Sequence, residues 1–410
     1  MDPRVTVPNI ASPEFKADPY PFYARLRAEA PVFEIRLRSG QPAWLVTRYD
    51  DVAAVLKDER FVKDRGNALS SQQRGKQPWV PDLFKPLARN MLDVDAPDHT
   101  RLRQLVHKAF SPRLVDRLRE RVQRLTEELI AAAERGGRMD LIADYALPIP
   151  ATIIAEMLGV PASDRRRFHR WSRVIVASNP SGWSMVLAIP SAIAFLRYIR
   201  RLVKARRSIP RDDLVTALVQ AEEEGARLNE DELVSMIFLL LIAGHETTVN
   251  LIGNGTLALL RHPGEMKRLR DEPGMIKVAV EELLRFDGPL GMATERYARE
   301  DVEVAGTVIR RGELVYAVLA SANRDERQFS EPDRLDLTRE PNKHLAFGLG
   351  VHYCLGAPLA RLEGHIAIGA LVSRFPNLRM TRRPLRWRRG LVLRGLDALP
   401  VDLGVNRLGS

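Results

Sequence analysis

The stretch FGLGVHYCLG, Phe347 to Gly356, contains the only cysteine among the 410 residues of the chain. A single cysteine excludes a framework of disulfides and a metal site with four thiolates. Glycines at positions 348, 350 and 356 surround Cys354 and allow the backbone to approach a flat, bulky group. The apolar run that follows has helical spacing and carries Pro358 in its first turn, so we expect Cys354 to lie at the start of a helix.

A sulfur at the start of a helix is favoured as a thiolate, because the helix dipole and the unpaired N–H groups there stabilise negative charge. Such a thiolate can act as a nucleophile or as a metal ligand. As a nucleophile it needs a base, and His352 lies two residues away. The alternative interpretation of a single cysteine is a buried structural residue without chemistry.

The longest predicted helix runs from Asn229 to His262, and Asn229 followed by Glu232 is typical of a capping box. Residues 234–243 of this helix are apolar nearly all round, which predicts that it is buried. Glu246 and Thr247 interrupt the apolar run in LLLIAGHETTVN. An acid beside a hydroxyl group suits proton delivery into a dry pocket, whereas the alternative is a threonine on a polar seam.

Composition places the chain among ordinary globular proteins, since 45% of its residues are apolar and 28% are charged. The opening residues lack the apolar core of a signal peptide, and no stretch reaches the length of a membrane span, so we expect a cytoplasmic protein. The formal net charge of +11 favours docking of an acidic protein over binding of nucleic acid. Neither a dinucleotide-binding fingerprint nor a phosphate loop is present, so redox chemistry needs electrons from another protein or from an oxidant.

Helical patterns dominate the chain, and the predicted fold class is mainly α with small β-sheets. A short strand is expected at residues 43–47, and hairpins are expected in the segments VEVAGTVIRRGELVYAVLA and GLVLRGLDALPVDL. No low-complexity linker or repeat divides the sequence, so we expect residues 1–410 to form a single domain. In VAVEELLRF, Glu282 and Arg285 lie three residues apart and can pair on one helix face.

These pieces, in this order, resemble the cytochrome P450 family of haem-thiolate monooxygenases. FGLGVHYCLG matches the haem signature F-x-x-G-x-x-x-C-x-G at Phe347, Gly350, Cys354 and Gly356, AGHETT matches the oxygen-activating helix motif, and Glu282 to Arg285 matches E-x-x-R. The resemblance covers nearly the whole chain. It implies the P450 fold, an α-rich haem domain with a long central helix, and it implies haem b with Cys354 as the axial ligand of the iron.

The resemblance also carries over to other positions. It implies haem-contacting roles for His99, Arg103, Arg296, His352, Ala243 and Gly244. The implied substrate-binding residues are Leu239, Ile242, Met292, Thr294, Val392 and Leu393. Arg334 is the implied third member of a structural triad with Glu282 and Arg285, and Glu246 stands where many members of the family carry aspartate.

The activity that the resemblance implies is O2-dependent hydroxylation of a hydrophobic small molecule, such as a polyketide, terpene, steroid or fatty acid. Electrons are expected from a ferredoxin-type protein with its NAD(P)H reductase. The expected docking patch near Cys354 comprises Arg101, Lys108, Arg113 and Arg361. Two alternatives remain open, a peroxide-driven peroxygenase and a non-catalytic haem protein that senses or binds a ligand. Segments 67–84 and 178–191 are the expected lids of the substrate pocket.

Overall fold

The structure is a computed structural model that describes residues 8–69, 90–110, 112–177, 183–223 and 225–405. Most of the two expected lids therefore lies outside the described residues. The chain divides into two compact units, each assembled from separated segments. The first unit comprises residues 1–77, 122–147 and 247–410, and the second comprises residues 78–121 and 148–246. That residues 1–410 form one domain stays a prediction.

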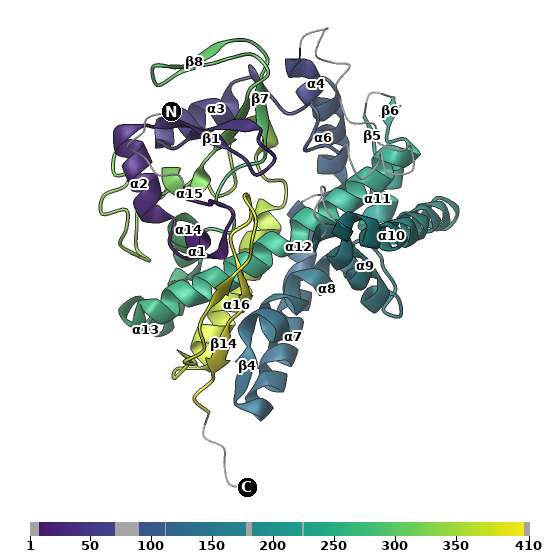
Figure 1. Ribbon diagram of the computed structural model, residues 1–410. Coiled ribbons are helices and arrows are strands. Elements are labelled where there is room, and N and C mark those ends of the chain that lie inside the picture. Colours follow the sequence, from purple (N-terminus) through teal and green to yellow (C-terminus); the bar gives the residue numbers. More distant parts are fainter. Residues whose placement is uncertain (1–7, 70–89, 111, 178–182, 224, 406–410) are drawn as a thin grey trace. The chain divides into compact units, whose positions relative to one another are not determined.

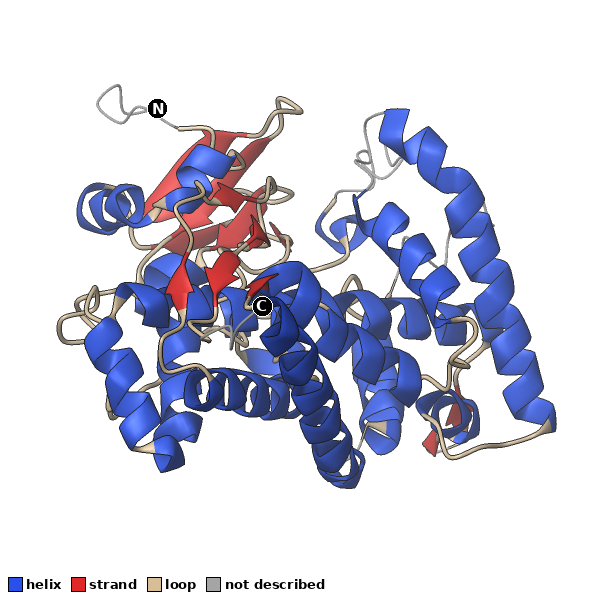
Figure 2. Cartoon of the chain, turned by 90° about the horizontal axis from the view of Figure 1, so that it is seen from below, coloured by secondary structure: helices blue, strands red, loops and turns tan. Residues whose placement is uncertain are grey.

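A five-stranded sheet of order β1-β2-β10-β7-β3 organises the first unit, and Figure 2 shows its strands gathered together. The strands are β1 (Val32–Arg36), β2 (Pro42–Val46), β3 (Phe61–Val62), β7 (Arg296–Ala298) and β10 (Leu314–Ala317). Strand β2 matches the strand expected at residues 43–47. It pairs antiparallel with β1 and parallel with β10, which joins two segments of chain about 270 residues apart.

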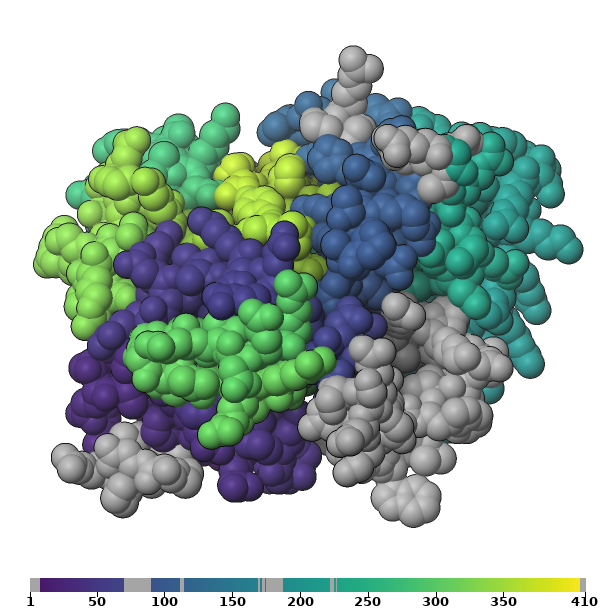
Figure 3. Space-filling model, turned by 90° about the horizontal axis from the view of Figure 1, so that it is seen from above, coloured from purple at the N-terminus to yellow at the C-terminus, as the bar shows by residue number. Residues whose placement is uncertain are grey.

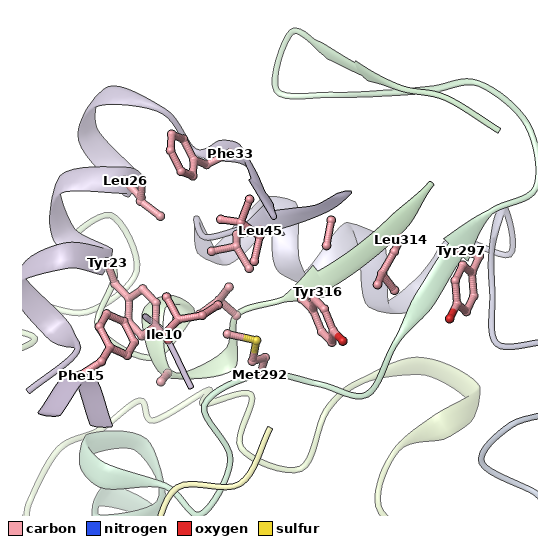
Figure 4. Packing of buried hydrophobic residues seen from close by; sticks show 14 of the residues in the cluster. Ile10, Phe15, Tyr23, Leu26, Phe33, Leu45, Met292, Tyr297, Leu314 and Tyr316 are labelled. Carbon is pink, nitrogen blue, oxygen red and sulfur yellow. The ribbon is translucent and has the colours of Figure 1, made fainter. Parts of the chain in front are cut away.

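Two apolar clusters hold this sheet to the N-terminal helices α1 (Pro13–Ala17), α2 (Tyr20–Glu29) and α3 (Tyr49–Lys57). One cluster, drawn in Figure 4, includes Tyr23 from α2 and Tyr316 from β10. The other packs the hairpin of β8 (Val302–Val304) and β9 (Thr307–Ile309) against α3. Figure 3 shows this hairpin, in green, lying over the purple N-terminal segment. The sequence prediction of a hairpin here is confirmed.

The expected hairpin at the C-terminal end is wrong. Strands β13 (Leu396–Ala398) and β14 (Pro400–Asp402) are too closely joined to turn back on each other, and they enter different sheets. Strand β13 pairs with β12 (Arg386–Trp387), whereas β14 pairs with β11 (Arg379–Met380) and β4 (Arg138–Asp140).

The remaining elements are helical. In the first unit they are α4 (Arg65–Ala68), the π-helix η3 (Leu141–Ala146), α13 (Pro263–Asp271), η4 (Pro273–Met275), α14 (Ile276–Asp287), α15 (Leu319–Ala322), η5 (Gly350–His352) and α16 (Ala357–Arg374). In the second unit they are α6 (Asp98–Ala109), α8 (Pro148–Met157), α9 (Arg165–Ala177), α10 (Trp183–Ser208) and α11 (Leu214–Gln220), beside the small hairpin of β5 (Glu222–Glu223) and β6 (Ala226–Arg227). Helices α7 (Pro112–Gly136) and α12 (Glu230–Arg261) contribute to both units, as Figure 1 labels them.

The long predicted helix is α12, and its start has the expected capping box. The backbone N–H of Glu232 donates to the side-chain oxygen of Asn229 at 2.9 Å, and the backbone N–H of Asn229 donates to the Glu232 carboxylate at 2.9 Å. Among the described residues, α12 is the one helix whose length and composition suit a membrane span, and 61% of that window is buried inside the protein. A buried core helix passes the same test.

Candidate functional site

The loop before α16 carries Cys354. The side chain of Cys354 is exposed, and its backbone N–H donates to the carbonyl of Phe347 at 3.0 Å, which closes the loop on itself. Gly350 has a φ of +73°, and a Cβ atom there would lie 2.7 Å from the carbonyl oxygen of Leu56 at the end of α3. The glycine of the signature is therefore required because the loop packs directly on backbone.

Helix α16 starts three residues after Cys354, with Gly356 at its N-cap and Pro358 in its first turn, as the sequence predicts. The positive end of the helix dipole therefore lies beside the sulfur and favours the thiolate. A Cβ atom on Gly356 would lie 4.0 Å from the Cys354 sulfur, so a larger side chain would compete for the space around the sulfur.

An ion-pair cluster beneath the loop fixes Phe347. Arg361 on α16 donates two hydrogen bonds of 2.7 Å to Glu281 on α14, and its guanidinium lies 4.4 Å from the centre of the Phe347 ring. His344 lies 3.0 Å from the same carboxylate. Burial alone would raise the pKa of Glu281, but the hydrogen bonds from Arg361 and His344 lower this pKa to about 2.

Ion pairs occupy two of the four residues of the expected docking patch, which stays a prediction. Arg361 is engaged by Glu281, and Arg101 forms an ion pair with Glu232 inside the second unit. An arginine that already binds a carboxylate offers little charge to a partner protein. The side chain of Arg113 lies outside the described residues, and Lys108 is exposed on α6.

Glu282 and Arg285 form a fully buried ion pair with two hydrogen bonds of 2.7 Å. The predicted third member, Arg334, is wrong as a side-chain partner, because its guanidinium is exposed and pairs with Glu331. Only the backbone carbonyl of Arg334 joins the network, by accepting a hydrogen bond from Arg285 at 3.1 Å. The arginine that reaches Glu282 is Arg339, at 3.2 Å.

Further bonds to Glu282 complete this network. The backbone N–H of Asp336 and the side-chain amide of Asn342 each donate a hydrogen bond of 3.0 Å to the carboxylate of Glu282. A buried carboxylate is expensive unless its oxygens are satisfied, and these donors satisfy both of them. The network therefore holds the chain from residue 336 to residue 342 against α14, ahead of the cysteine loop.

Helix α12 is mostly buried, but one face of it, called the uncovered face below, is not fully covered by the residues that the structure describes. Leu239, Ile242 and Glu246 are half-buried and Ala243 is exposed, at the spacing that places them on one helix face. Gly244 is half-buried, and a Cβ atom on it would lie 3.3 Å from Ile154, so it lies where α12 packs on α8. Thr247, the next residue along the uncovered face, is half-buried as well.

A buried acid that the sequence reasoning missed contacts the buried Thr248 of α12. Glu363 on α16 is fully buried, accepts a hydrogen bond from Thr248, and has a second carboxylate oxygen without a partner. Burial raises the pKa of Glu363 to about 8, against the opposing effect of the Thr248 hydrogen bond, so the carboxyl group is protonated at neutral pH. The sequence offered one signal for this residue, because Glu363 stands where the helical pattern of α16 predicts a buried apolar side chain.

The residues predicted to bind substrate belong to both units, and those of the first unit have different surroundings. Met292 is fully buried in the apolar cluster of Figure 4, so its prediction as a pocket residue is wrong: its side chain packs in the N-terminal core. Thr294 is half-buried and accepts a hydrogen bond from Lys63 at 2.6 Å. Val392 and Leu393 are half-buried, and they join the same segment because the N–H of Gly291 donates to the Val392 carbonyl at 2.8 Å.

The cations predicted to hold carboxylates divide between the two units. In the first unit Arg296 is buried on β7, and His352 is half-buried at the end of η5, two residues before Cys354. In the second unit His99 is buried and Arg103 is half-buried, one turn apart on α6. Burial and the charge of Arg103 lower the pKa of His99, so this histidine is neutral near pH 7. The placement of His99 and Arg103 against Cys354 stays a prediction.

Comparison with known proteins gives a consistent result. A family model described as Cytochrome P450 matches residues 198–385. The polyketide biosynthesis cytochrome P450 PksS of Bacillus subtilis is 44% identical over 395 residues, which cover 95% of this chain and 97% of that protein.

Solved structures share the fold over nearly the whole chain. A myxobacterial cytochrome P450 in complex with myristic acid superposes with a TM-score of 0.89 at 42% identity, covering 98% of this chain and 100% of that chain. P450BioI, solved with an acyl carrier protein ligated to hexadec-9Z-enoic acid, superposes with a TM-score of 0.86 at 38% identity, covering 96% of this chain and 99% of that chain.

Proposed function

Because the chain belongs to the cytochrome P450 family and is a haem b monooxygenase, we propose that it hydroxylates a long acyl or polyketide chain, free or linked to a carrier protein. The relatives confirm the expected family, fold class, cofactor and enzyme class. We propose the substrate, the electron donor and the roles of individual residues below.

The observation that carries the proposal is the exposed thiol of Cys354 at the start of α16. An exposed cysteine in a closed, glycine-rich loop does not fit the alternative of a buried structural residue. The adjacent helix N-terminus favours the charged form of the sulfur, which is the form that binds a metal.

The residues of the chain fit haem b. Cys354 supplies an exposed thiolate, Gly356 leaves room beside the sulfur, Gly350 lets the loop pack on the end of α3, and Arg296 supplies a buried cation for a propionate. His352, His99 and Arg103 are the further proposed propionate partners, with Phe347 beside the sulfur. When bound, haem b supplies the activation of O2 and the oxidation of a C–H bond.

The chain's own contribution is a route for protons. Glu246 and Thr247 lie on the uncovered face of α12, where a carboxyl group can take protons from water and the hydroxyl group can pass them on. Glu363 is proposed to hold a proton behind them, since its carboxyl group is protonated at neutral pH and contacts Thr248. Buried groups that keep protons in this way suit a site that excludes bulk water.

The substrate class follows from the uncovered face of α12 and from the relatives. Leu239, Ile242 and Ala243 offer apolar surface without a fixed charge, which favours an uncharged hydrocarbon segment. Thr294, Val392 and Leu393 are proposed to contribute from the first unit. Relatives are named for polyketide biosynthesis or were solved with fatty acyl ligands, so a long acyl or polyketide chain is proposed over a steroid or terpene.

Electrons are proposed to come from a ferredoxin-type protein with its NAD(P)H reductase, in the cytoplasm. An acid and a hydroxyl side by side on α12 favour O2 over the peroxide-driven alternative, because peroxide already brings the electrons and protons. The same pair has no purpose in a non-catalytic haem sensor. Consumption of NADH in the presence of hexadecanoic acid, ferredoxin and reductase separates the O2-dependent function from the other two.

The absorption spectrum of the reduced protein under carbon monoxide tests the haem-thiolate assignment. The wild type is expected to show the strongly red-shifted Soret band of thiolate-ligated haem, and Cys354→Ser is expected to lose it. Val351→Ala, an exposed neighbour in the same loop, is expected to keep it. A red-shifted band that survives in Cys354→Ser would remove Cys354 as the ligand.

A further inference from the structure

Helices α9 and α10 of the second unit carry a concentration of positive charge that the proposed chemistry does not use. Helix α9 contains five arginines and α10 contains five arginines and one lysine, and neither helix contains a carboxylate. These eleven cations equal the formal net charge of the whole chain, +11. Outside these helices the positive and negative charges of the chain therefore balance.

A groove of about 620 Å³ lies between these two helices, which run side by side in Figure 1. One face of α10 lines it, through Ala194, Arg197, Tyr198, Arg201, Leu202 and Ala205. Arg167 and Trp171 line it from α9, and Arg211 closes one end. The groove therefore combines an aromatic floor with cationic walls.

The charges of the groove are available to a partner. Arg197, Arg201 and Arg211 are exposed, and none of them forms an ion pair with a carboxylate within the part of the chain that the structure describes. Three other groove residues already have partners: Arg206 pairs with Asp213 outside the groove, and Tyr198 donates to Asp164 within it at 3.1 Å.

The aromatic residues supply a contact surface of the kind found at protein interfaces. The rings of Trp171 and Tyr198 lie 5.8 Å apart, and the guanidinium of Arg167 lies 5.6 Å from the centre of the Trp171 ring. Tryptophan, tyrosine and arginine are the residue types that contribute most to binding at protein interfaces. A concave groove accepts protruding side chains, whereas a lipid surface requires an exposed apolar helix face.

We propose that this groove docks a small acidic carrier protein, whose surface carboxylates pair with Arg197 and Arg201 while an apolar side chain packs against Trp171 and Tyr198. The proposal rests on the proposed function, because the carrier is the protein that would present the acyl chain. Complementary charge would steer the encounter, so binding should weaken as salt screens it.

Isothermal titration calorimetry of the haem-loaded protein tests this docking, with a hexadecanoyl-loaded acyl carrier protein as the probe. Arg197→Glu/Arg201→Glu is expected to weaken binding by about tenfold or more, because repulsion replaces two attractive pairs. The matched control is Arg382→Glu/Arg383→Glu, which changes the net charge equally at two exposed arginines of the first unit and is expected to stay within about twofold of the wild type.

Equal weakening in both double variants, or no binding by the wild type, would overturn the proposal. So would a groove variant that loses binding to phosphatidylglycerol vesicles or to duplex DNA but still binds the carrier, since the groove would then serve a membrane or a nucleic acid. Oxidation of free hexadecanoic acid by the wild type tests the proposed function separately, because the free acid needs no carrier. Calorimetry reports docking whether or not turnover occurs.

Discussion

At the scale of single residues, the neighbours Thr247 and Thr248 have different surroundings. Thr247 lies on the uncovered face of α12, whereas Thr248 is buried and donates to Glu363. Neighbouring residues of an α-helix are rotated by about 100° from each other. This rotation places one hydroxyl group on the half-buried face and the other against a buried acid. The two threonines therefore allow separate tests of proton supply.

Thr247→Ala is expected to uncouple O2 consumption from oxidation of the substrate. Without the hydroxyl group, protons reach the site less directly, so the yield of product per NADH should fall by about tenfold or more while peroxide accumulates. Measured product and peroxide per NADH check this. Thr247→Ser keeps the hydroxyl group and should restore coupling, and tightly coupled turnover in the alanine variant would remove Thr247 from the proton route.

Glu363 is expected to make stability depend on pH in a direction opposite to that of most carboxylates. Its pKa is about 8 in the folded protein, above the ordinary value of 4.5, so the folded state binds the extra proton between these pH values. The free energy of unfolding should therefore fall as pH rises from about 4.5 to 8.

Urea denaturation of the wild type and of Glu363→Gln across that range measures the effect. The glutamine is neutral at every pH, so the variant is expected to lose this decline and to become relatively more stable at the upper end. Parallel curves for the two proteins would show that the Glu363 carboxyl group is ionised in the fold. Glu340→Gln, at an exposed carboxylate, is the control and is expected to follow the wild type.

At the scale of elements, the cysteine loop is held by the helices on either side of it. Glu281 on α14 joins Arg361 on α16 and His344 at the start of the loop, and Gly350 rests on the backbone at the end of α3. Three elements thus fix a loop that has no regular structure except one 3-10 turn. A loop anchored in this way holds the thiol in one position.

Glu281→Gln is expected to lower the free energy of unfolding by about 2 kcal/mol, because the charge-assisted bonds to Arg361 and His344 are weakened. The folded pKa of Glu281, about 2, lies below the ordinary 4.5, so its contribution is present above pH 4.5 and is lost as pH falls toward 2. Denaturation curves at pH 3 and pH 7 check this. A difference between variant and wild type that is equal at both pH values would contradict the ion-pair account.

At the scale of the whole molecule, the excess positive charge is not spread over the surface. It equals the charge of two helices of the second unit, while Arg361 and Arg101, two of the four residues expected to form a patch near Cys354, pair with Glu281 and Glu232. Net charge read from the sequence predicted an acidic partner but not the surface that would receive it. Only the pairing of individual side chains shows which cations are available.

Local signals in the sequence were sufficient for much of the fold. The capping box at Asn229, the helix after Cys354, strand β2 and the hairpin β8–β9 were predicted because their determinants lie within a few residues of each other. The haem signature is likewise one continuous stretch, so the family and the cofactor followed from it.

What the tertiary structure decided depends on contacts between distant segments. Arg339 rather than Arg334 reaches Glu282 across 57 residues, Arg361 meets Glu281 across 80, and Met292 is taken into the N-terminal core. No periodicity encodes which of several arginines meets a given carboxylate, since that follows from how the backbone segments pack. The sequence by itself therefore determined the family, the haem cofactor and the main helices, whereas folding decided which charges are paired and which acid is buried.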